Sequence, residues 1–574
     1  MHDEPRTDAE RRALAAFTAA EPPADFADRV LAADLAERRG SAARAPFARL
    51  LGLGAPRLAG LAVAAVAAVA IATAAAAGWM PEWTGLSRHV PSVIPAELPR
   101  DASPVSATLP EGPPVPELAL PADLEARVDA YIGAFGRNYG EAFKFHGVVG
   151  VVKDGELVLT RGYGRADLRR DGPNTATTKF KIGSLTQTFT AVAILQLRDR
   201  GLVDLDAPVR KYIPDYPATG NRITVRHLLT HTSGIPSYTD AAVFSVGHTR
   251  PVATADVRAI FQDLPLEFAP GTDFDLSNSG YYLLGQVVES VARQPFADYL
   301  THNILAPAGM KDSGIGLTPG ALGHEFDEDE VLVPAEQRHF SAYGSAAGMV
   351  STAADLARWD HALRTPGLVL AQKSLDEMTT VVRGEYGMGW FVRKDGGNTI
   401  AWHPGGVEGY NATIARFLGD GVTVFVLANT EAVDTRDVAY DLAQIAHGAE
   451  VSLPQEHTEV RLSVAELARY SGNYVLTETT QQAMKGLIEA DELGALQQVR
   501  VSRTGDRLFM HVPEHGDKWM HYMGDDRFFF KDPSATIAEF GPPGTPVAHL
   551  TLQQGELRFI LKREREDEKR ERED

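Results

Sequence analysis

The chain of 574 residues contains no cysteine. This absence excludes disulfide scaffolds, zinc sites built from thiolates and catalysis by a cysteine nucleophile. A surplus of basic charge is also missing, because 56 Lys and Arg residues stand against 76 Asp and Glu residues and give a formal net charge of −20. Proteins that bind nucleic acid neutralise its phosphates with clustered basic residues. We therefore expect no nucleic-acid partner.

One long uncharged run stands out, at residues 58–80. It is long enough to cross a hydrocarbon core of about 30 Å as a helix. Five arginines lie within the 20 residues before it, whereas only Glu82 and Arg88 follow closely. The positive-inside rule then predicts a single-pass anchor in the inner membrane, with the N-terminus in the cytoplasm and the main domain periplasmic or otherwise extracytoplasmic. A buried Ala-rich helix and a cleaved signal peptide are the alternatives.

The rest of the chain divides by composition. Residues 1–57 form a short cytoplasmic segment, which either docks a cytoplasmic partner or only sets topology. Prolines recur through residues 81–121 and predict an extended spacer. Residues 122–448 form the main globular domain, and residues 449–561 carry short strands with glycine turns that predict a small antiparallel β-barrel. Residues 562–574 are a solvated charged tail.

The main domain has strand patterns at both of its ends and helical patterns between them. Alternating apolar residues at 148–152 and 157–160 flank Asp154-Gly155, a type I′ hairpin signal. Strand patterns return from about residue 386 to residue 428, and a helix is expected at 434–446. The pattern predicts an α+β fold in which an antiparallel sheet joins both ends of the domain and is flanked by helices.

Ser184 stands where a strand-like segment meets an amphipathic helix that ends at Gly201. A serine at this place has its hydroxyl near the free N–H groups and the positive dipole end of the helix, which suit an oxyanion. The alternative is that Ser184 only caps the helix. The residues alone leave both interpretations open.

The order of ten segments resembles the penicillin-recognising serine hydrolases, namely class C β-lactamases, D-alanyl-D-alanine carboxypeptidases and related esterases. These segments run from about residue 145 to about residue 429 and include KIGSLTQTFTA, ITVRHLLTHTSGIPSY, PGTDFDLSNSGYYLLGQVVE, YGMGWFV, WHPGGVEGYNA and FVLANTE. The resemblance implies a β-lactamase/transpeptidase-like fold, and the predicted barrel is similar to the lipocalin-like C-terminal domain of some relatives.

By this resemblance Ser184 matches the nucleophile. The family lysine three residues later is Gln187 here, and the tyrosine of the second motif is Leu276, whereas the asparagine of that motif is kept as Asn278. A serine hydroxyl is a poor nucleophile without a neighbouring base, and neither glutamine nor leucine can accept its proton. The resemblance therefore implies either a ligand-binding pseudoenzyme or a strongly impaired hydrolase.

The third family motif appears as His403-Pro404-Gly405 and is followed by Gly406. The resemblance implies that this strand binds substrate and supplies an N–H group to the oxyanion hole. The implied ligand is a small acyl compound, a β-lactam or a wall peptide, and no cofactor is expected.

The alternative is an active esterase, D-aminopeptidase or carboxypeptidase that uses a relocated base. Four residues are candidates for that base: His403, Lys181, Asp275 and Tyr281. His227 and His231 have helical spacing, but no carboxylate completes a zinc motif, so we expect no metal.

Overall fold

The computed structural model describes residues 118–564 apart from 138, 246–247, 328, 396, 455–456, 485–492, 495, 513–515, 532–535, 542–546 and 555–556. The expected cytoplasmic segment, the expected membrane helix, nearly all of the proline-rich spacer and most of the charged tail lie outside the described residues. Among the helices that are described, none is both long and apolar enough to cross a membrane.

A six-stranded antiparallel sheet forms the centre of the main domain, with the strand order β2-β1-β11-β10-β9-β8. Its strands are β1 (Gly147–Lys153), β2 (Glu156–Tyr163), β8 (Phe391–Asp395), β9 (Asn398–Val407), β10 (Tyr410–Phe417) and β11 (Val422–Ala428). β1 pairs with β11 along its whole length, so strands from the two ends of the domain are neighbours. This confirms the predicted closure of the domain by one antiparallel sheet.

The hairpin between β1 and β2 follows from its turn residues. Asp154 has a φ of 53° and Gly155 a φ of 82°, the positive values that a type I′ turn requires. Asparagine, aspartate and glycine adopt this conformation at the least cost. The turn predicted from Asp154-Gly155 is confirmed.

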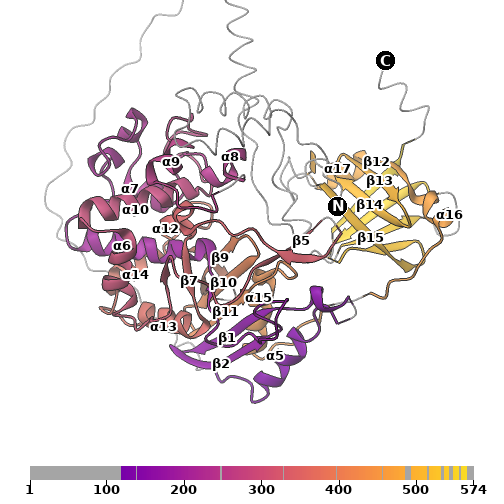
Figure 1. The fold of residues 1–574 in the computed structure, drawn as a ribbon, viewed down its shortest axis with the longest axis horizontal. Helices are drawn as coiled ribbons and strands as arrows, with labels where there is room; N and C mark the ends of the chain where they lie inside the picture. The colour runs from indigo at the N-terminus through magenta and orange to yellow at the C-terminus, as the bar shows by residue number, and fades with distance from the viewer. Residues whose placement is uncertain are drawn as a thin grey trace, which may run out of the picture. The chain divides into compact units, whose positions relative to one another are not determined.

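Helices cover both faces of the sheet, and β1 and β11 are therefore buried over almost all of their length. On one face Val148 and Phe425 join the main hydrophobic core. On the other face Thr413 of β10 lies within 2.9 Å of Thr435 at the start of α15 (Thr435–Ala446), and α5 (Leu124–Ile132) packs beside α15. Figure 1 shows α15 and α5 next to the strands of this sheet.

The segment between β2 and β8 is mainly helical. Its helices are α6 (Thr186–Asp199), α7 (Val225–Leu229), α8 (Ala242–Ser245), α9 (Thr254–Ala259), α10 (Asn278–Ala292), α11 (Phe296–Leu300), α12 (Gly344–Ala347), α13 (Ala353–Arg364) and α14 (Gln372–Met378). Short strands interrupt it: β3 (Phe180–Lys181), β4 (Gly314–Ile315), β5 (His324–Phe326), β6 (Leu332–Pro334) and β7 (Met349–Ser351). The observed α+β architecture agrees with the predicted fold class.

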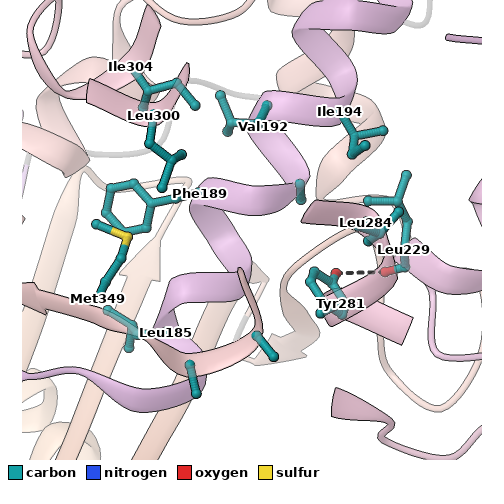
Figure 2. Close-up of a cluster of buried hydrophobic side chains, with 14 of the residues drawn as sticks. Leu185, Phe189, Val192, Ile194, Leu229, Tyr281, Leu284, Leu300, Ile304 and Met349 are labelled. Carbon is teal, nitrogen blue, oxygen red and sulfur yellow. Dashed lines mark hydrogen bonds between the residues drawn. The ribbon is translucent and has the colours of Figure 1, made fainter. Parts of the chain in front are cut away.

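α6 runs through the middle of this helical region. Every residue from Thr186 to Leu197 is buried, so the helix is packed on all sides. Figure 2 shows Phe189 and Val192 of α6 among Leu300, Ile304 and Met349. Residues at the N-terminal end of α6, where Ser184 and Gln187 stand, are therefore held by a rigid core.

The C-terminal region forms a closed eight-stranded barrel, as predicted. Its strands are β12 (Gly472–Leu476), β13 (Gln498–Thr504), β14 (Arg507–Val512), β15 (Gly516–Gly524), β16 (Arg527–Phe529), β17 (Ile537–Gly541), β18 (His549–Gln554) and β19 (Leu557–Arg563), accompanied by α16 (Val464–Leu467) and α17 (Glu478–Met484). Alternate residues of the strands, among them Tyr474, Met510 and Phe540, pack together as one buried cluster. The core of this barrel is therefore built from its own side chains.

Candidate active site

Ser184 lies in a short 3-10 turn, η2 (Gly183–Leu185), between β3 and α6. The N-cap of α6 is Leu185 and carries no side-chain cap hydrogen bond, so the interpretation of Ser184 as a helix cap is wrong. Within the described part of the chain, the Ser184 hydroxyl makes no hydrogen bond, and the residue is only partly buried. The hydroxyl therefore has no capping role, and no base of the described residues is hydrogen-bonded to it.

The third predicted motif lies against this turn. His403, Gly405 and Gly406 belong to β9, and β8 pairs with β9 only as far as Trp402. A Cβ atom at Gly405 would lie 2.0 Å from the carbonyl oxygen of Ile182, and one at Gly183 would lie 2.5 Å from the backbone nitrogen of Gly406. Only glycine allows the two backbones to approach this closely, and the structure thereby brings β9 next to Ser184.

Gln187 occupies the first turn of α6 and is almost fully buried. Its Nε2 donates to Oδ1 of Asn278 over 3.0 Å, and its Oε1 lies 3.1 Å from Nε2 of His231. Asn278 in turn donates from Nδ2 to Oγ1 of Thr239 over 2.8 Å. The amide of Gln187 therefore fixes the orientation of Asn278, although it has no useful affinity for a proton.

His231 organises this network, whereas the sequence pointed to it only as one of two helically spaced histidines. Its Nδ1 accepts a hydrogen bond of 3.0 Å from the backbone N–H of Ser277, which precedes Asn278. The other nitrogen, Nε2, must therefore carry the hydrogen that is donated to Gln187 in the neutral ring. His231 also has a φ of 54°, a conformation that side chains other than glycine rarely adopt. Both ring nitrogens have partners, so this imidazole has no lone pair to offer Ser184.

His403 has the same limitation. Its Nδ1 lies 2.6 Å from the carbonyl oxygen of Pro404, which can only accept, so Nδ1 carries the hydrogen. Nε2 then accepts from the hydroxyl of Tyr386 over 3.2 Å, and that hydroxyl lies 3.5 Å from Oε1 of Gln187. Burial lowers the pKa of His403 to about 4, so the ring is neutral near pH 7. Burial also raises the pKa of Tyr386 well above its usual range, which keeps the phenol protonated.

In two of the remaining candidate bases, Tyr281 and Lys181, the side chain has another partner. Tyr281 lies in the core and donates to the carbonyl oxygen of Leu229 over 2.8 Å, as Figure 2 shows. The ammonium of Lys181 lies 3.4 Å from the carbonyl oxygen of Arg338 and 5.9 Å from the ring centre of Tyr410. The backbone of Asp275 donates to the carbonyl oxygen of His231, and Leu276 is a partly buried aliphatic side chain.

His227 and His231 have separate partners despite their helical spacing. Nδ1 of His227 accepts from the backbone N–H of Thr224 and closes a capping box at the start of α7. His231 belongs to the Gln187 network instead. Among the described residues, no group of three His, Asp or Glu side chains is arranged to hold a metal ion.

Comparison with known proteins agrees with this geometry. The family model described as Beta-lactamase matches residues 135–449, more than half of the chain. The chain belongs to this family. The match contains the Ser184 turn, the Asn278 helix and β9.

Individual relatives of this beta-lactamase family member are distant. "Penicillin-binding protein 4*" of Bacillus subtilis (strain 168) is 26% identical over 433 residues, which cover 69% of this chain and 90% of that protein. "Protein flp" of Staphylococcus aureus (strain MW2) is 31% identical over 298 residues, which cover 49% of this chain and 58% of that protein. The octameric penicillin-binding protein homologue from Pyrococcus abyssi superposes with a TM-score of 0.52 at 25% identity, over 76% of this chain and 99% of that one.

The structure places the predicted residues on three elements of the matched region, with Ser184 in η2, Asn278 in α10, and Gly405 and Gly406 in β9. The assignment of Gln187 and Leu276 to the family's lysine and tyrosine positions stays a prediction. Hydrogen bonds link His231 to Gln187 and to the backbone N–H of Ser277, and they link Tyr386, which the sequence did not single out, to His403.

Proposed function

We propose that the Ser184 site binds an acyl compound or wall peptide without efficient turnover, as a pseudoenzyme of the beta-lactamase family. The observation that carries the proposal is the closed neutral network around Gln187. In it, His231 and His403 each have both ring nitrogens engaged.

Proton transfer is the step that this network fails to support. When Oγ of Ser184 forms a bond to an acyl carbon, its hydrogen must pass to a base. Gln187 cannot accept it, and both neighbouring imidazoles already use their lone pairs. In serine hydrolases that act through a coupled unit, loss of one essential member lowers turnover by a factor on the order of 10⁶.

Ligand binding does not need this proton transfer. The amide of Gln187 holds the Asn278 side chain in place, and the glycines of β9 hold the backbone next to Ser184. A site of this kind keeps the groups that orient a ligand and lacks the group that activates the nucleophile. This combination favours recognition over hydrolysis.

Location is a further part of the proposal. An anchor at residues 58–80 and the proline-rich spacer would hold the domain outside the cytoplasm, where wall fragments occur. Protease treatment of intact spheroplasts that carry the full-length protein tests this. Degradation of the main domain is expected, and its protection would contradict the proposed orientation.

Introducing a lysine at position 187 and a tyrosine at position 276 tests whether Ser184 lacks only a base and a proton relay. We expect wild-type protein to react with a fluorescent penicillin very slowly, and the double variant Gln187→Lys/Leu276→Tyr to react at least about 100-fold faster, because it regains a base and a proton relay. Gln187→Met/Leu276→Tyr is the matched control, since methionine has similar length and accepts no proton. Ser184→Ala in the double variant should abolish labelling.

The competing function is a hydrolase with a relocated base. Fast labelling of the wild type, within about 10-fold of the double variant and abolished by Ser184→Ala, would establish that function and refute the pseudoenzyme. Thermal unfolding of all variants verifies that each is folded.

A further inference from the structure

A group of charged side chains lies near the turn that joins β9 and β10. Glu408 forms an ion pair with Arg338, and one of its carboxylate oxygens accepts a hydrogen bond of 2.6 Å from the hydroxyl of Tyr343. The Arg338 guanidinium also lies 5.0 Å from the ring centre of Phe244. The charges of Arg338 and Glu408 therefore compensate each other.

Lys181 adds a second positive charge to this group. Its ammonium contacts only the carbonyl oxygen of Arg338 and the face of Tyr410, and no carboxylate of the described residues lies within ion-pair distance of it. The side chain is partly buried. Arg338 thus has a carboxylate partner, whereas the ammonium of Lys181 has none among the described residues.

The position of Lys181 relative to Ser184 suits its ammonium for contact with a ligand bound at Ser184. Lys181 ends β3, three residues before Ser184, and Gly183 between them packs on Gly406. Glu408 follows Gly406 by two residues. A ligand whose acyl group lies at Ser184 and whose chain follows β9 towards the turn therefore approaches the ammonium.

We infer that Lys181 is a specificity-determining residue that pairs with a carboxylate of the ligand. This inference rests on the proposed binding function of the Ser184 site. An ammonium that is partly removed from water gains more from a carboxylate partner than an exposed one does. Arg338 is already neutralised by Glu408, so the uncompensated charge belongs to Lys181.

The pH range in which this pairing acts follows from the surroundings of Lys181. Burial, with a contribution from the nearby Arg338 guanidinium, lowers the pKa of Lys181 to about 8. Burial raises the pKa of the neighbouring Tyr343 and Tyr410, so neither phenol loses its proton near pH 8. Affinity for a carboxylate ligand is therefore expected to fall as the pH rises above about 8, once the ammonium loses its proton.

Calorimetric titration of the full chain with two matched probes tests the inference. The probes are N-acetyl-D-alanyl-D-alanine and its C-terminal amide, which differ by one negative charge. Wild-type protein should bind the acid about 10-fold more tightly than the amide at pH 7. The preference should disappear in Lys181→Met, persist in Lys181→Arg, and decline above pH 8 for the acid only.

Lys179→Met is the matched control, because Lys179 lies on the same segment and pairs with Asp312 over 3.1 Å. It should leave the preference unchanged. Equal affinity of wild-type protein for both probes would overturn the role of Lys181 while leaving the binding function intact. Binding of neither probe would refute the proposed function and this inference with it.

Discussion

The two sides of Ser184 are built on different physical principles. On the β9 side, glycines let two backbones approach so closely that no side chain fits between them. On the α6 side, directed hydrogen bonds join Gln187, His231, Asn278 and Tyr386, and this network reaches β9 only through His403. The structure of the first side depends on glycines, which have no side chain. The structure of the second side depends on which atom of each hydrogen-bonded pair carries the hydrogen. A site can therefore keep its shape and lose its chemistry when the change falls on the second side only.

The largest effect is expected where the backbone contact is broken. A methyl group at Gly405 would lie 2.0 Å from the oxygen of Ile182 and 2.9 Å from the nitrogen of Leu185. Backbone atoms cannot rotate away, so Gly405→Ala should lower the free energy of unfolding by more than about 3 kcal/mol and abolish ligand binding. Denaturant titration measures the first effect and calorimetry the second.

Gly172→Ala provides the control, because a Cβ atom there has nothing within 4 Å. If Gly405→Ala were as stable as this control, close packing of the two backbones would not hold the site together.

The second largest effect is a loss of folding stability at acidic pH, which we expect from His403. The pKa of His403 falls from its ordinary 6.5 to about 4 on burial, so the unfolded chain takes up a proton before the folded one as the pH decreases. The neutral ring of His403 therefore contributes up to about 3 kcal/mol to the free energy of unfolding. This contribution is complete above about pH 6.5 and is lost as the pH falls from 6.5 to 4. His403→Gln should flatten the pH dependence of unfolding free energy in that window. His302→Gln, at an exposed position, should leave it unchanged, and equal slopes for both variants would contradict the neutral buried ring.

A smaller loss is expected at the residue that links the network. His231→Phe keeps an aromatic ring beside Tyr281 and Tyr386 but removes the acceptor for the Ser277 N–H and the donor to Gln187. The unfolding free energy should fall by about 2 kcal/mol. Ligand affinity should fall about 10-fold as Asn278 loses its fixed orientation. Unchanged affinity in a folded variant would show that Asn278 is held without His231.

The smallest effect is expected at Tyr386. Tyr386→Phe removes one hydrogen bond to His403 and should destabilise the fold by about 1 kcal/mol. Tyr281→Phe, which removes the bond to Leu229, should do the same. Neither change should alter the rate at which Ser184 is labelled by a fluorescent penicillin. A decrease of more than about 10-fold for Tyr386→Phe alone would make that hydroxyl part of the chemistry.

Sequence analysis predicted the features that depend on local signals. Asp154-Gly155 defines a turn by its own backbone preferences, and the strands around Gly505 show alternation that a short stretch reveals. The motif segments locate Ser184, Asn278 and Gly405 because each stands in its own recognisable stretch. The replacement of the family lysine and tyrosine by Gln187 and Leu276 stays a prediction from the same stretches.

The network itself could not be predicted from the sequence. His231 is 44 residues away from Gln187, and Tyr386 is 199 residues away. Nothing in the local pattern of either residue distinguishes a packed aromatic ring from a hydrogen-bonding partner. The direction of each hydrogen bond follows only from which carbonyl or N–H group lies opposite, such as Pro404 for His403. Sequence analysis therefore left His403 open as a base, whereas the contacts argue against it.

The pairing of the first and last strands of the C-terminal barrel has a consequence for circular permutation of this domain. β12 pairs directly with β19, with Tyr474 opposite Arg563, so the first and the last strand of the ring are neighbours. A short linker could join them, and new termini could be opened at the hairpin between Thr504 and Arg507 without removing any strand from the ring. Such a circular permutant should keep the same barrel, since the neighbours of each strand stay the same while their order along the chain changes.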